Sequence, residues 1–280
     1  MKSAYKILTA IFLLLLLSGC GAFIFQPEKK HYPNKNIEKV NIEEIVFPST
    51  DGTKLHGWIL TPKSGEPYKG TILHFHGNAQ NISTHSGFVI WLVEAGYRAV
   101  VFDYRGYGKS EGAPSMMGVH LDAEAAIEKA FTLSGVEEEG LIVFGQSLGG
   151  AIAIRTVADS PRKSRIRVLI LESVFSDYRA IAREKAALCL LSWPFQYPIA
   201  YSYSNRYSPL KWIKRVSPVP VLIIHGTNDP VVPWHHGESL FKAAAEPKGF
   251  WTTAPAGHTR SFADPNVRQE LLHYLENPGR

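Results

Sequence analysis

The sequence predicts a single α/β domain built on a mostly parallel, eight-stranded sheet flanked by helices. Two observations support this prediction. Segments typical of strands and of helices alternate along most of the chain, and the central strand segments are apolar at almost every position. Strands buried on both faces have this pattern, and alternation with helices favours parallel pairing. The 280 residues, 45% of them hydrophobic, suffice for one large core.

The expected elements follow one another from residue 40 onward. The first two strands form a pair joined by a turn at residues 49–52, and helices separate most of the later strands. Strands are expected at residues 40–47, 54–60, 71–75, 99–102, 141–144, 168–171, 221–224 and 250–253. Helices are expected at residues 83–94, 119–133, 148–158, 235–245 and 267–275.

Residues 174–217 interrupt this alternation between two core strands. A long insertion here is typical of a small cap over a site at the carboxyl ends of the strands. The insertion is rich in aromatic side chains, which either pack the cap onto the body or line a substrate cavity. They are Phe175, Tyr178, Trp193, Phe195, Tyr197, Tyr201, Tyr203, Tyr207 and Trp212.

The N-terminus has the features of a bacterial lipoprotein signal. Lys2 and Lys6 precede an apolar run over residues 7–17. The sequence Leu-Ser-Gly-Cys at 17–20 then resembles a lipobox, in which Cys20 is acylated and becomes the mature N-terminus. This resemblance implies a palmitate-type lipid anchor and a domain that lies outside the cytoplasm, in the bacterial cell envelope.

The expected organisation is a signal peptide at residues 1–19, a lipidated cysteine with a polar tether at 20–38, and the folded domain at 39–280. An uncleaved signal anchor is the alternative. Residues 7–25 contain no charged side chain, and their length just suffices to span a bilayer. Both interpretations predict that the N-terminus attaches the domain to a membrane.

Charge and cysteine content add few constraints. The net charge of +5 is mild, and a short basic run at residues 162–167 is interpreted as a solvated loop or as a patch for an anionic surface. No nucleic-acid-binding motif accompanies it. If Cys20 carries lipid, Cys189 has no partner for a disulfide, and we expect it to be a small buried residue.

A nucleophile motif follows the fifth expected strand. Gly145, Ser147 and Gly149 form a G-x-S-x-G pattern between an apolar strand segment and a helical segment. In this context the motif predicts a nucleophile elbow, a sharp turn that presents the serine hydroxyl above the sheet. The backbone N–H of Leu148 would then lie at the helix start, where it can bind an oxyanion.

A serine needs a base and a group that orients the base, and in this arrangement they follow it as acid and then histidine. Asp229 comes directly after the strand at residues 221–224, and Glu172 is the alternative acid. His258 follows the last expected strand, with Gly257 before it. The predicted catalytic residues are therefore Ser147, Asp229 and His258.

The loop after the third strand completes the predicted site. His74 and His76 alternate on one strand and could suggest a metal site, but no carboxylate or cysteine cluster accompanies them. The preferred interpretation is that Asn78 in this loop donates the second N–H of the oxyanion hole, opposite Leu148. Asp103 and Arg105, after the next strand, are expected to form a structural pair.

Together these motifs resemble those of α/β-hydrolase-fold serine hydrolases over residues 40–276. The matching pieces are His76-Gly77-Asn78, Asp103-Tyr104-Arg105-Gly106-Tyr107-Gly108, Gly145-Gln146-Ser147-Leu148-Gly149, His225-Gly226-Thr227-Asn228-Asp229 and Gly257-His258. The chain is similar to the membrane-associated branch with an HGN loop, which is grouped with serine aminopeptidase-like sequences. The resemblance implies that Ser147 attacks, His258 transfers the proton and Asp229 orients His258.

These observations predict a membrane-tethered serine hydrolase. It would cleave small-molecule carboxylic esters with apolar or lipid-like acyl groups through an acyl-enzyme, without a metal or another cofactor. Peptidase and thioesterase chemistry use the same catalytic parts and remain alternatives. A non-catalytic envelope protein that uses the fold as a binding scaffold is the alternative from another class. The oligomeric state is left open.

Overall fold

The computed structural model describes residues 24–188 and 190–279. The predicted signal sequence, Cys20 and Cys189 therefore lie outside the described residues, and the predictions about them are untested. Within the described part of the chain, no helix is both long enough and apolar enough to cross a bilayer.

The predicted eight-stranded sheet is present, with the strand order β1-β2-β4-β3-β5-β6-β7-β8. The first two strands run antiparallel and β2 pairs antiparallel with β4, while all the other pairs are parallel. The strands are β1 (Asn41–Pro48), β2 (Lys54–Thr61), β3 (Thr71–Phe75), β4 (Arg98–Phe102), β5 (Leu141–Gln146), β6 (Ile166–Glu172), β7 (Val221–Gly226) and β8 (Lys248–Thr253).

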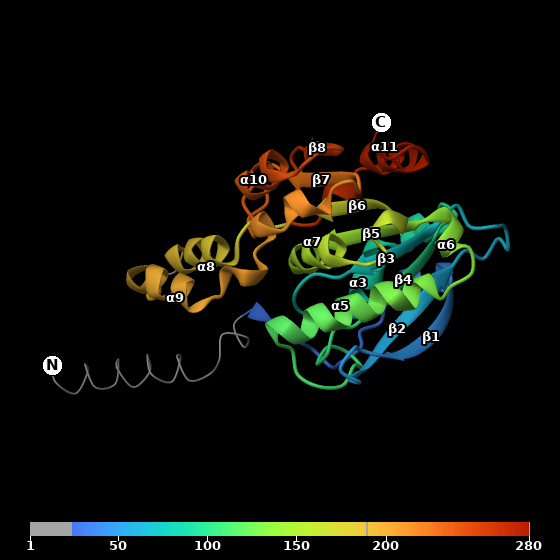
Figure 1. The fold of residues 1–280 in the computed structure, drawn as a ribbon, viewed down its shortest axis with the longest axis horizontal. Helices are drawn as coiled ribbons and strands as arrows, with labels where there is room; N and C mark the ends of the chain where they lie inside the picture. Colours follow the sequence, from blue (N-terminus) through green and yellow to red (C-terminus); the bar gives the residue numbers. More distant parts are fainter. Residues whose placement is uncertain (1–23, 189, 280) are drawn as a thin grey trace.

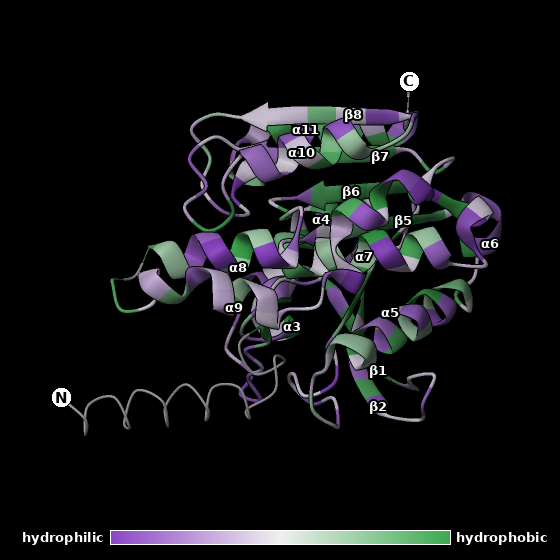
Figure 2. Ribbon diagram, turned by 60° about the vertical axis from the view of Figure 1, so that its left-hand side comes forward, coloured by the Kyte–Doolittle hydropathy of each residue, from purple (hydrophilic) through white to green (hydrophobic). Residues whose placement is uncertain are grey.

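Helices pack on both faces of this sheet (Figure 1). One hydrophobic cluster joins the sheet to α5 (Met116–Phe131), α7 (Leu148–Asp159) and α10 (His235–Ala243). The other cluster joins its opposite face to α4 (Ile90–Glu94) and α11 (Pro265–Glu276). In Figure 2 the central strands are hydrophobic, whereas α5 and α7 alternate in hydropathy, as expected of helices with one buried side.

The predicted helix over residues 83–94 is broken into three pieces. They are α3 (Ile82–His85), the 3₁₀ turn η2 (Ser86–Phe88) and α4. Gly87 lies in the middle piece, and glycine is among the weakest helix formers. The remaining short elements are η1 (Lys35–Lys39), α6 (Val136–Glu139), η3 (Lys163–Arg165) and η8 (Ser261–Ala263).

The basic run at residues 162–167 takes part in local pairing. Arg162 lies 3.2 Å from Glu137 and 3.3 Å from Glu128, and Arg167 donates to the backbone at the end of α11. These contacts favour the solvated-loop interpretation of the run, since acidic partners already neutralise part of its charge.

Residues 174–217 leave the sheet after β6 and return to it at β7. They form α8 (Tyr178–Ala187), η4 (Trp193–Phe195), α9 (Gln196–Ser202), η5 (Asn205–Tyr207), η6 (Pro209–Lys211) and η7 (Ile213–Val216). Helices α8 and α9 pack on each other and project beyond the sheet (Figure 1). We refer to residues 174–217 as the cap.

The segment expected to be a polar tether instead packs against the domain. Phe25 is buried in the larger hydrophobic cluster. The Asn81 side chain donates to the carbonyls of Glu28 and Lys30, and the backbone N–H of Gly108 donates to Glu28 as well. The polar composition of residues 26–38 suggested a tether, but the body of the protein binds backbone groups of this segment.

Candidate active site

Ser147 occupies a sharp turn between β5 and α7. Its φ of 51° and ψ of −119° form a strained conformation for a residue with a side chain. Glycines permit the close packing around this turn. A β-carbon on Gly149 would lie 2.1 Å from the carbonyl oxygen of Phe75, and one on Gly150 would lie 2.2 Å from Val174. The local geometry is that of a nucleophile elbow.

His258 and Asp229 meet directly, as the sequence predicted. Asp229 follows β7 and His258 follows β8, and these strands are neighbours, so their carboxyl ends bring the two loops together. His258 Nδ1 lies 2.8 Å from Asp229 Oδ2. This contact places the proton on Nδ1 and leaves Nε2 of His258 with a lone pair to act as a base.

The surroundings of Asp229 keep it ionised. Burial alone would raise the pKa of Asp229, but the hydrogen bond from His258 and the backbone N–H donors of Val232 and Val231 outweigh burial. The pKa of Asp229 is therefore below its usual value. An ionised, fixed carboxylate stabilises the imidazolium that forms when His258 takes a proton.

Glu172, the alternative acid, is committed to other contacts. Its carboxylate accepts from the side chain of Gln146 at 2.6 Å and from the backbone N–H of Ser261 at 2.9 Å. Burial raises the pKa of Glu172. Asp229, not Glu172, is the carboxylate that bonds the histidine.

Asn78 and Leu148, the predicted oxyanion donors, line the same cavity as Ser147. Leu148 is the first residue of α7, where backbone N–H groups are free for a ligand. The Asn78 side chain donates to the carbonyl of Ile24 and accepts from the N–H of Gln26 and from the hydroxyl of Tyr107. The oxyanion role of both backbone N–H groups stays a prediction.

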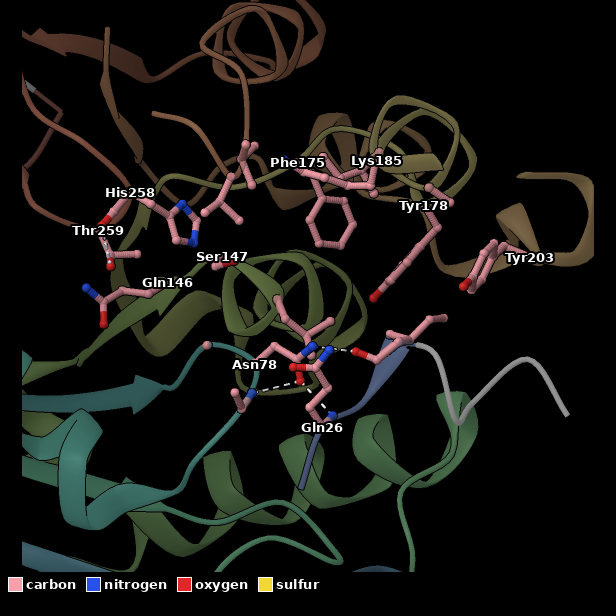
Figure 3. A pocket seen from close by; sticks show the side chains of 18 of the residues that line it. Gln26, Asn78, Gln146, Ser147, Phe175, Tyr178, Lys185, Tyr203, His258 and Thr259 are labelled. Carbon is pink, nitrogen blue, oxygen red and sulfur yellow. Dashed lines mark hydrogen bonds between the residues drawn. The ribbon is translucent and has the colours of Figure 1, made fainter. Parts of the chain in front are cut away.

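A cavity of about 640 Å³ lies between the sheet edge and the cap. Figure 3 shows His258 beside Ser147, with Phe175, Tyr178 and Tyr203 on the cap side and Asn78 with Gln26 on the opposite side. The lining also includes Ile24, Gly77, Ala79, His85, Phe88, Gln146, Leu148, Ile181, Ala182, Lys185, Ala186, Ser192, Ile199, Val231, Val232 and Thr259. Its walls are mainly apolar, which suits an acyl chain.

Both interpretations of the cap aromatics apply, but to different residues. Phe175, Tyr178 and Tyr203 line the cavity. Tyr207 instead stacks on His120 of α5, with 4.7 Å between ring centroids. Trp212 packs against Arg155 and Arg215. Others are largely exposed at the tip of the cap, namely Trp193, Phe195, Tyr197 and Tyr201.

His74 of β3 and His76 directly after it each bond a protein group through one ring nitrogen. His74 Nε2 lies 2.9 Å from Gln146 Oε1, and His76 Nδ1 lies 2.7 Å from the carbonyl oxygen of Gly77. Burial lowers the pKa of both rings, that of His74 to about 3, so both are neutral. His76 thereby braces the loop that carries Asn78.

The expected pairing of Asp103 with Arg105 is wrong. Arg105 binds Asp122 of α5 through several hydrogen bonds, the shortest of 2.7 Å, and Asp51 at 2.8 Å. Asp103 accepts from the backbone N–H of Ile82 at 2.9 Å. Each residue is held by partners from other elements, so nearness in sequence did not produce contact.

Sequence reasoning missed the parts of the site that come from distant segments. Ile24 and Gln26 reach the cavity from the N-terminal segment, and Gln146 links His74 to Glu172. Thr259, which has a φ of 52°, donates its N–H to the hydroxyl of Ser173, just before the cap. Gln146 and Thr259 lie in or beside motifs, but no local pattern reveals their contacts, because each partner is far along the chain.

Related proteins can be aligned with most of this chain. The family described as serine aminopeptidase, S33 matches residues 66–197. The YfhR protein of Escherichia coli K12 is 36% identical over 258 residues, covering 90% of this chain and 86% of that protein. WAV2 of Arabidopsis thaliana, described as an α/β-hydrolase domain-containing protein, is 33% identical and covers 77% of this chain and 71% of that protein.

Solved structures show the same fold. The Pyrococcus furiosus esterase Pf2001 superimposes with a TM-score of 0.70 at 18% identity, covering 90% of this chain and 97% of that one. An acetyl xylan esterase from Paenibacillus sp. R4 gives a TM-score of 0.65, also at 18% identity, with coverage of 90% and 96%. At this identity the likeness establishes the architecture.

Proposed function

Because the chain belongs to the α/β-hydrolase family, we propose that it is a serine hydrolase that cleaves carboxylic esters with apolar, lipid-like acyl groups. The observation that carries this proposal is the bond between His258 and Asp229 beside Ser147, at the base of an apolar cavity. The esterase titles of the structural neighbours agree with it.

The geometry supports a two-step reaction. Nε2 of His258 takes the proton of Ser147 as Oγ attacks the ester carbonyl, and the backbone N–H groups of Asn78 and Leu148 stabilise the oxyanion. His258 then gives the proton to the leaving alkoxide, and the C–O bond breaks to leave an acyl-enzyme. Water, deprotonated by the same histidine, releases the carboxylic acid and restores Ser147.

We also propose that the domain works at a membrane, attached through a lipid on Cys20. Ile24, only four residues after Cys20, lines the cavity, so any anchor at that cysteine holds the cavity close to the bilayer. The tip of the cap agrees with this placement. Leu188, Leu190 and Leu191 are 77%, 88% and 85% exposed, together with Trp193, Tyr197 and Tyr201. Such a patch on a soluble surface marks an interaction site.

The test of catalysis uses the full chain in detergent with a fluorophosphonate probe, read by intact mass. We expect one adduct in the wild type and none in Ser147→Ala, with Ser239→Ala on α10 as a matched control that keeps the adduct. Hydrolysis should be lost with the adduct, while the melting temperature of Ser147→Ala stays within a few degrees of the wild type.

The outcomes separate the alternatives. A well-folded wild type without an adduct would favour a binding scaffold and sink the esterase proposal. An adduct with turnover of aminoacyl amides or thioesters, but not of esters, would favour the peptidase or thioesterase alternative. The anchor is tested separately by labelling cells with a palmitate analogue, which should mark the wild type and spare Cys20→Ser.

A further inference from the structure

A second cluster of polar side chains lies outside the catalytic cavity, where the N-terminal segment crosses the sheet edge. It comprises His31 of that segment, His56 of β2 and Asp103 directly after β4. Each side chain offers one atom, and the three atoms lie within 4.8 Å of one another. His56 Nδ1 is 3.9 Å from Asp103 Oδ2.

The facing atoms lack hydrogen-bond partners. His31 Nε2, His56 Nδ1 and Asp103 Oδ2 are all buried and unpaired among the described residues. The side chains of His56 and Asp103 are only 4% and 0% exposed. Buried polar atoms are nearly always satisfied in folded proteins, and three orphans that face one another indicate a shared partner.

Neighbouring contacts decide which atoms His56 and Asp103 present. Nε2 of His56 lies 2.5 Å from Glu44 Oε1, so it carries the proton and leaves a lone pair on Nδ1. Oδ1 of Asp103 accepts from the N–H of Ile82, which leaves Oδ2 free. A lone pair of His56 and a carboxylate oxygen of Asp103 therefore face the same space as His31 Nε2, and a cation bound by all three atoms would stabilise this arrangement. The carboxylate behind a ligating histidine is a recurring feature of metal sites.

Gly108 keeps the space at the cluster open. A β-carbon at this position would lie 2.0 Å from Asp103 Oδ2 and 3.2 Å from His31 Nε2. Gly108 has a φ of 46°, which also disfavours other residues. Any side chain there would fill the space beside both ligand atoms.

We propose that His31, His56 and Asp103 bind a divalent first-row transition-metal ion, with Zn²⁺ as the best match. Two imidazole nitrogens and one carboxylate oxygen, with water as a fourth ligand, are a donor set that zinc favours. Tetrahedral bonds of about 2.1 Å place ligand atoms about 3.4 Å apart. The ion would therefore draw His56 Nδ1 and Asp103 Oδ2, now 3.9 Å apart, closer by about half an ångström.

The ion would fasten the N-terminal segment to the sheet. His31 belongs to the same segment as Ile24 and Gln26, which line the cavity, while Asp103 Oδ1 lies 3.6 Å from His76 Nε2. The site is thus a structural clasp beside the oxyanion loop, and it does not depend on the proposed esterase activity.

A second histidine–carboxylate group is a poorer candidate. Glu184 of α8 bonds His235 at 3.2 Å and His236 at 3.1 Å, and the other nitrogen of His236 bonds Ser176. The facing atoms of this group already satisfy each other and hold the cap to α10. It serves as the internal comparison for the test.

The test is metal retention by the full chain in detergent. The protein is stripped with chelator, incubated with Zn²⁺, desalted and analysed by elemental mass spectrometry. We expect one zinc per chain in the wild type, a loss of at least tenfold in His31→Ala, and full retention in His235→Ala and in the surface variant His273→Ala. His31 is partly exposed and its segment is held by Asn81, so its variant should fold.

Two further results bear on the proposal. Zinc should raise the melting temperature of the wild type but not of His31→Ala, and Co²⁺ should give visible absorption bands of low-coordinate cobalt only in the wild type. A wild type that retains no zinc overturns the proposal whatever the variants do. Zinc that is lost in His235→Ala and kept in His31→Ala also overturns it, by moving the site to the cap.

Discussion

The body of the domain supplies Ser147 and His258 from loops that leave sheet strands, whereas the cap supplies Phe175 and Tyr178 from an insertion of short helices. The body residues are fixed by close contacts. Gly149 and Gly150 allow the Ser147 turn to pack against β3 and Val174, and two backbone N–H groups hold Asp229.

The cap is joined to the body by an apolar base and by polar contacts of α8. Val174, Tyr207 and Ile213 belong to the larger hydrophobic cluster of the body. From α8, Lys185 donates to the carbonyl of Pro230 and Glu184 bonds two histidines of α10. Several of these are exposed polar contacts, which contribute little individually. The difference teaches that the ends of the sheet strands hold the catalytic side chains, while the inserted cap builds the opposite wall of the cavity.

The sharpest test of the body is Asp229→Asn. The change keeps the size of the side chain but removes the acceptor that fixes the Nδ1–H tautomer of His258. We expect kcat to fall by about 10⁴-fold while the fold survives, as for the corresponding change in another serine hydrolase triad. Stopped-flow or steady-state hydrolysis of a chromogenic ester would measure it.

Glu172→Gln is the matched control, because it makes the same chemical change in a buried carboxylate that does not touch His258. It disturbs the bonds with Gln146 and Ser261, so we expect a stability loss of about 1–3 kcal/mol with kcat changed by less than about tenfold. Equal losses of kcat in both variants would show that Asp229 has no special role.

Acid should destabilise the fold, in part where the cap packs against the body. Burial lowers the pKa of His120, at this contact, and of His74, in the body, to about 3. Protonation therefore favours the unfolded state, and stability present above pH 6.5 is lost as the pH falls below it. Each histidine contributes about 1.4 kcal/mol per pH unit, or about 3 kcal/mol for both between pH 7.5 and 5.5.

Chemical denaturation at the two pH values measures this loss. His120→Phe keeps a ring that can stack on Tyr207 but has no proton to bind, so the pH dependence should shrink by about half of that 3 kcal/mol. An unchanged pH dependence of the unfolding free energy would mean that His120 is solvated, and that Tyr207 of the cap does not exclude water from it.

Tyr178→Phe tests how the cap selects substrates. The Tyr178 hydroxyl is buried without a partner among the described residues, and its side chain lines the cavity. We expect kcat/KM to fall about tenfold for esters with a polar group that can accept this hydroxyl, and little for plain alkyl esters. Tyr207→Phe, outside the cavity, should leave both substrate classes alike.

The smallest expected effect concerns the cap tip. Replacing Leu190 and Leu191 with serine removes exposed apolar surface. Partial burial of that surface in a bilayer would contribute about 1 kcal/mol to the free energy of membrane binding. Activity on esters in vesicles should fall about fivefold relative to a short soluble ester. Met117→Ser, exposed on α5, is the control. A parallel loss on the soluble ester would point to a damaged cap rather than a lost membrane contact.

The sequence allowed the sheet and the contact between Asp229 and His258 to be predicted for one physical reason. Buried strands can be recognised by their apolar runs, and residues that directly follow parallel strands lie together at one edge of the sheet. The position of Ser147 was clear as well, because its glycines are required by contacts with β3 and with Val174.

Features that depend on long-range polar pairing could not be predicted. Arg105 binds Asp122 and Asp51 and not Asp103. The segment at residues 26–38 bonds to the side chains of Asn78 and Asn81. Polar side chains carry no periodicity that reveals a partner some fifty positions away. The path of the cap was equally hidden, since its short helices follow prolines and tertiary contacts rather than an amphipathic repeat.

The side chain of Asn78 has a consequence for how the chain tolerates cleavage. It bonds Ile24 and Gln26, and Asn78 itself lines the cavity. A protease that cut just after Phe25 would do more than free the domain from whatever precedes it. The cut would remove Ile24, which lines the cavity and accepts from Asn78. The same cleavage would therefore release the domain and open the cavity.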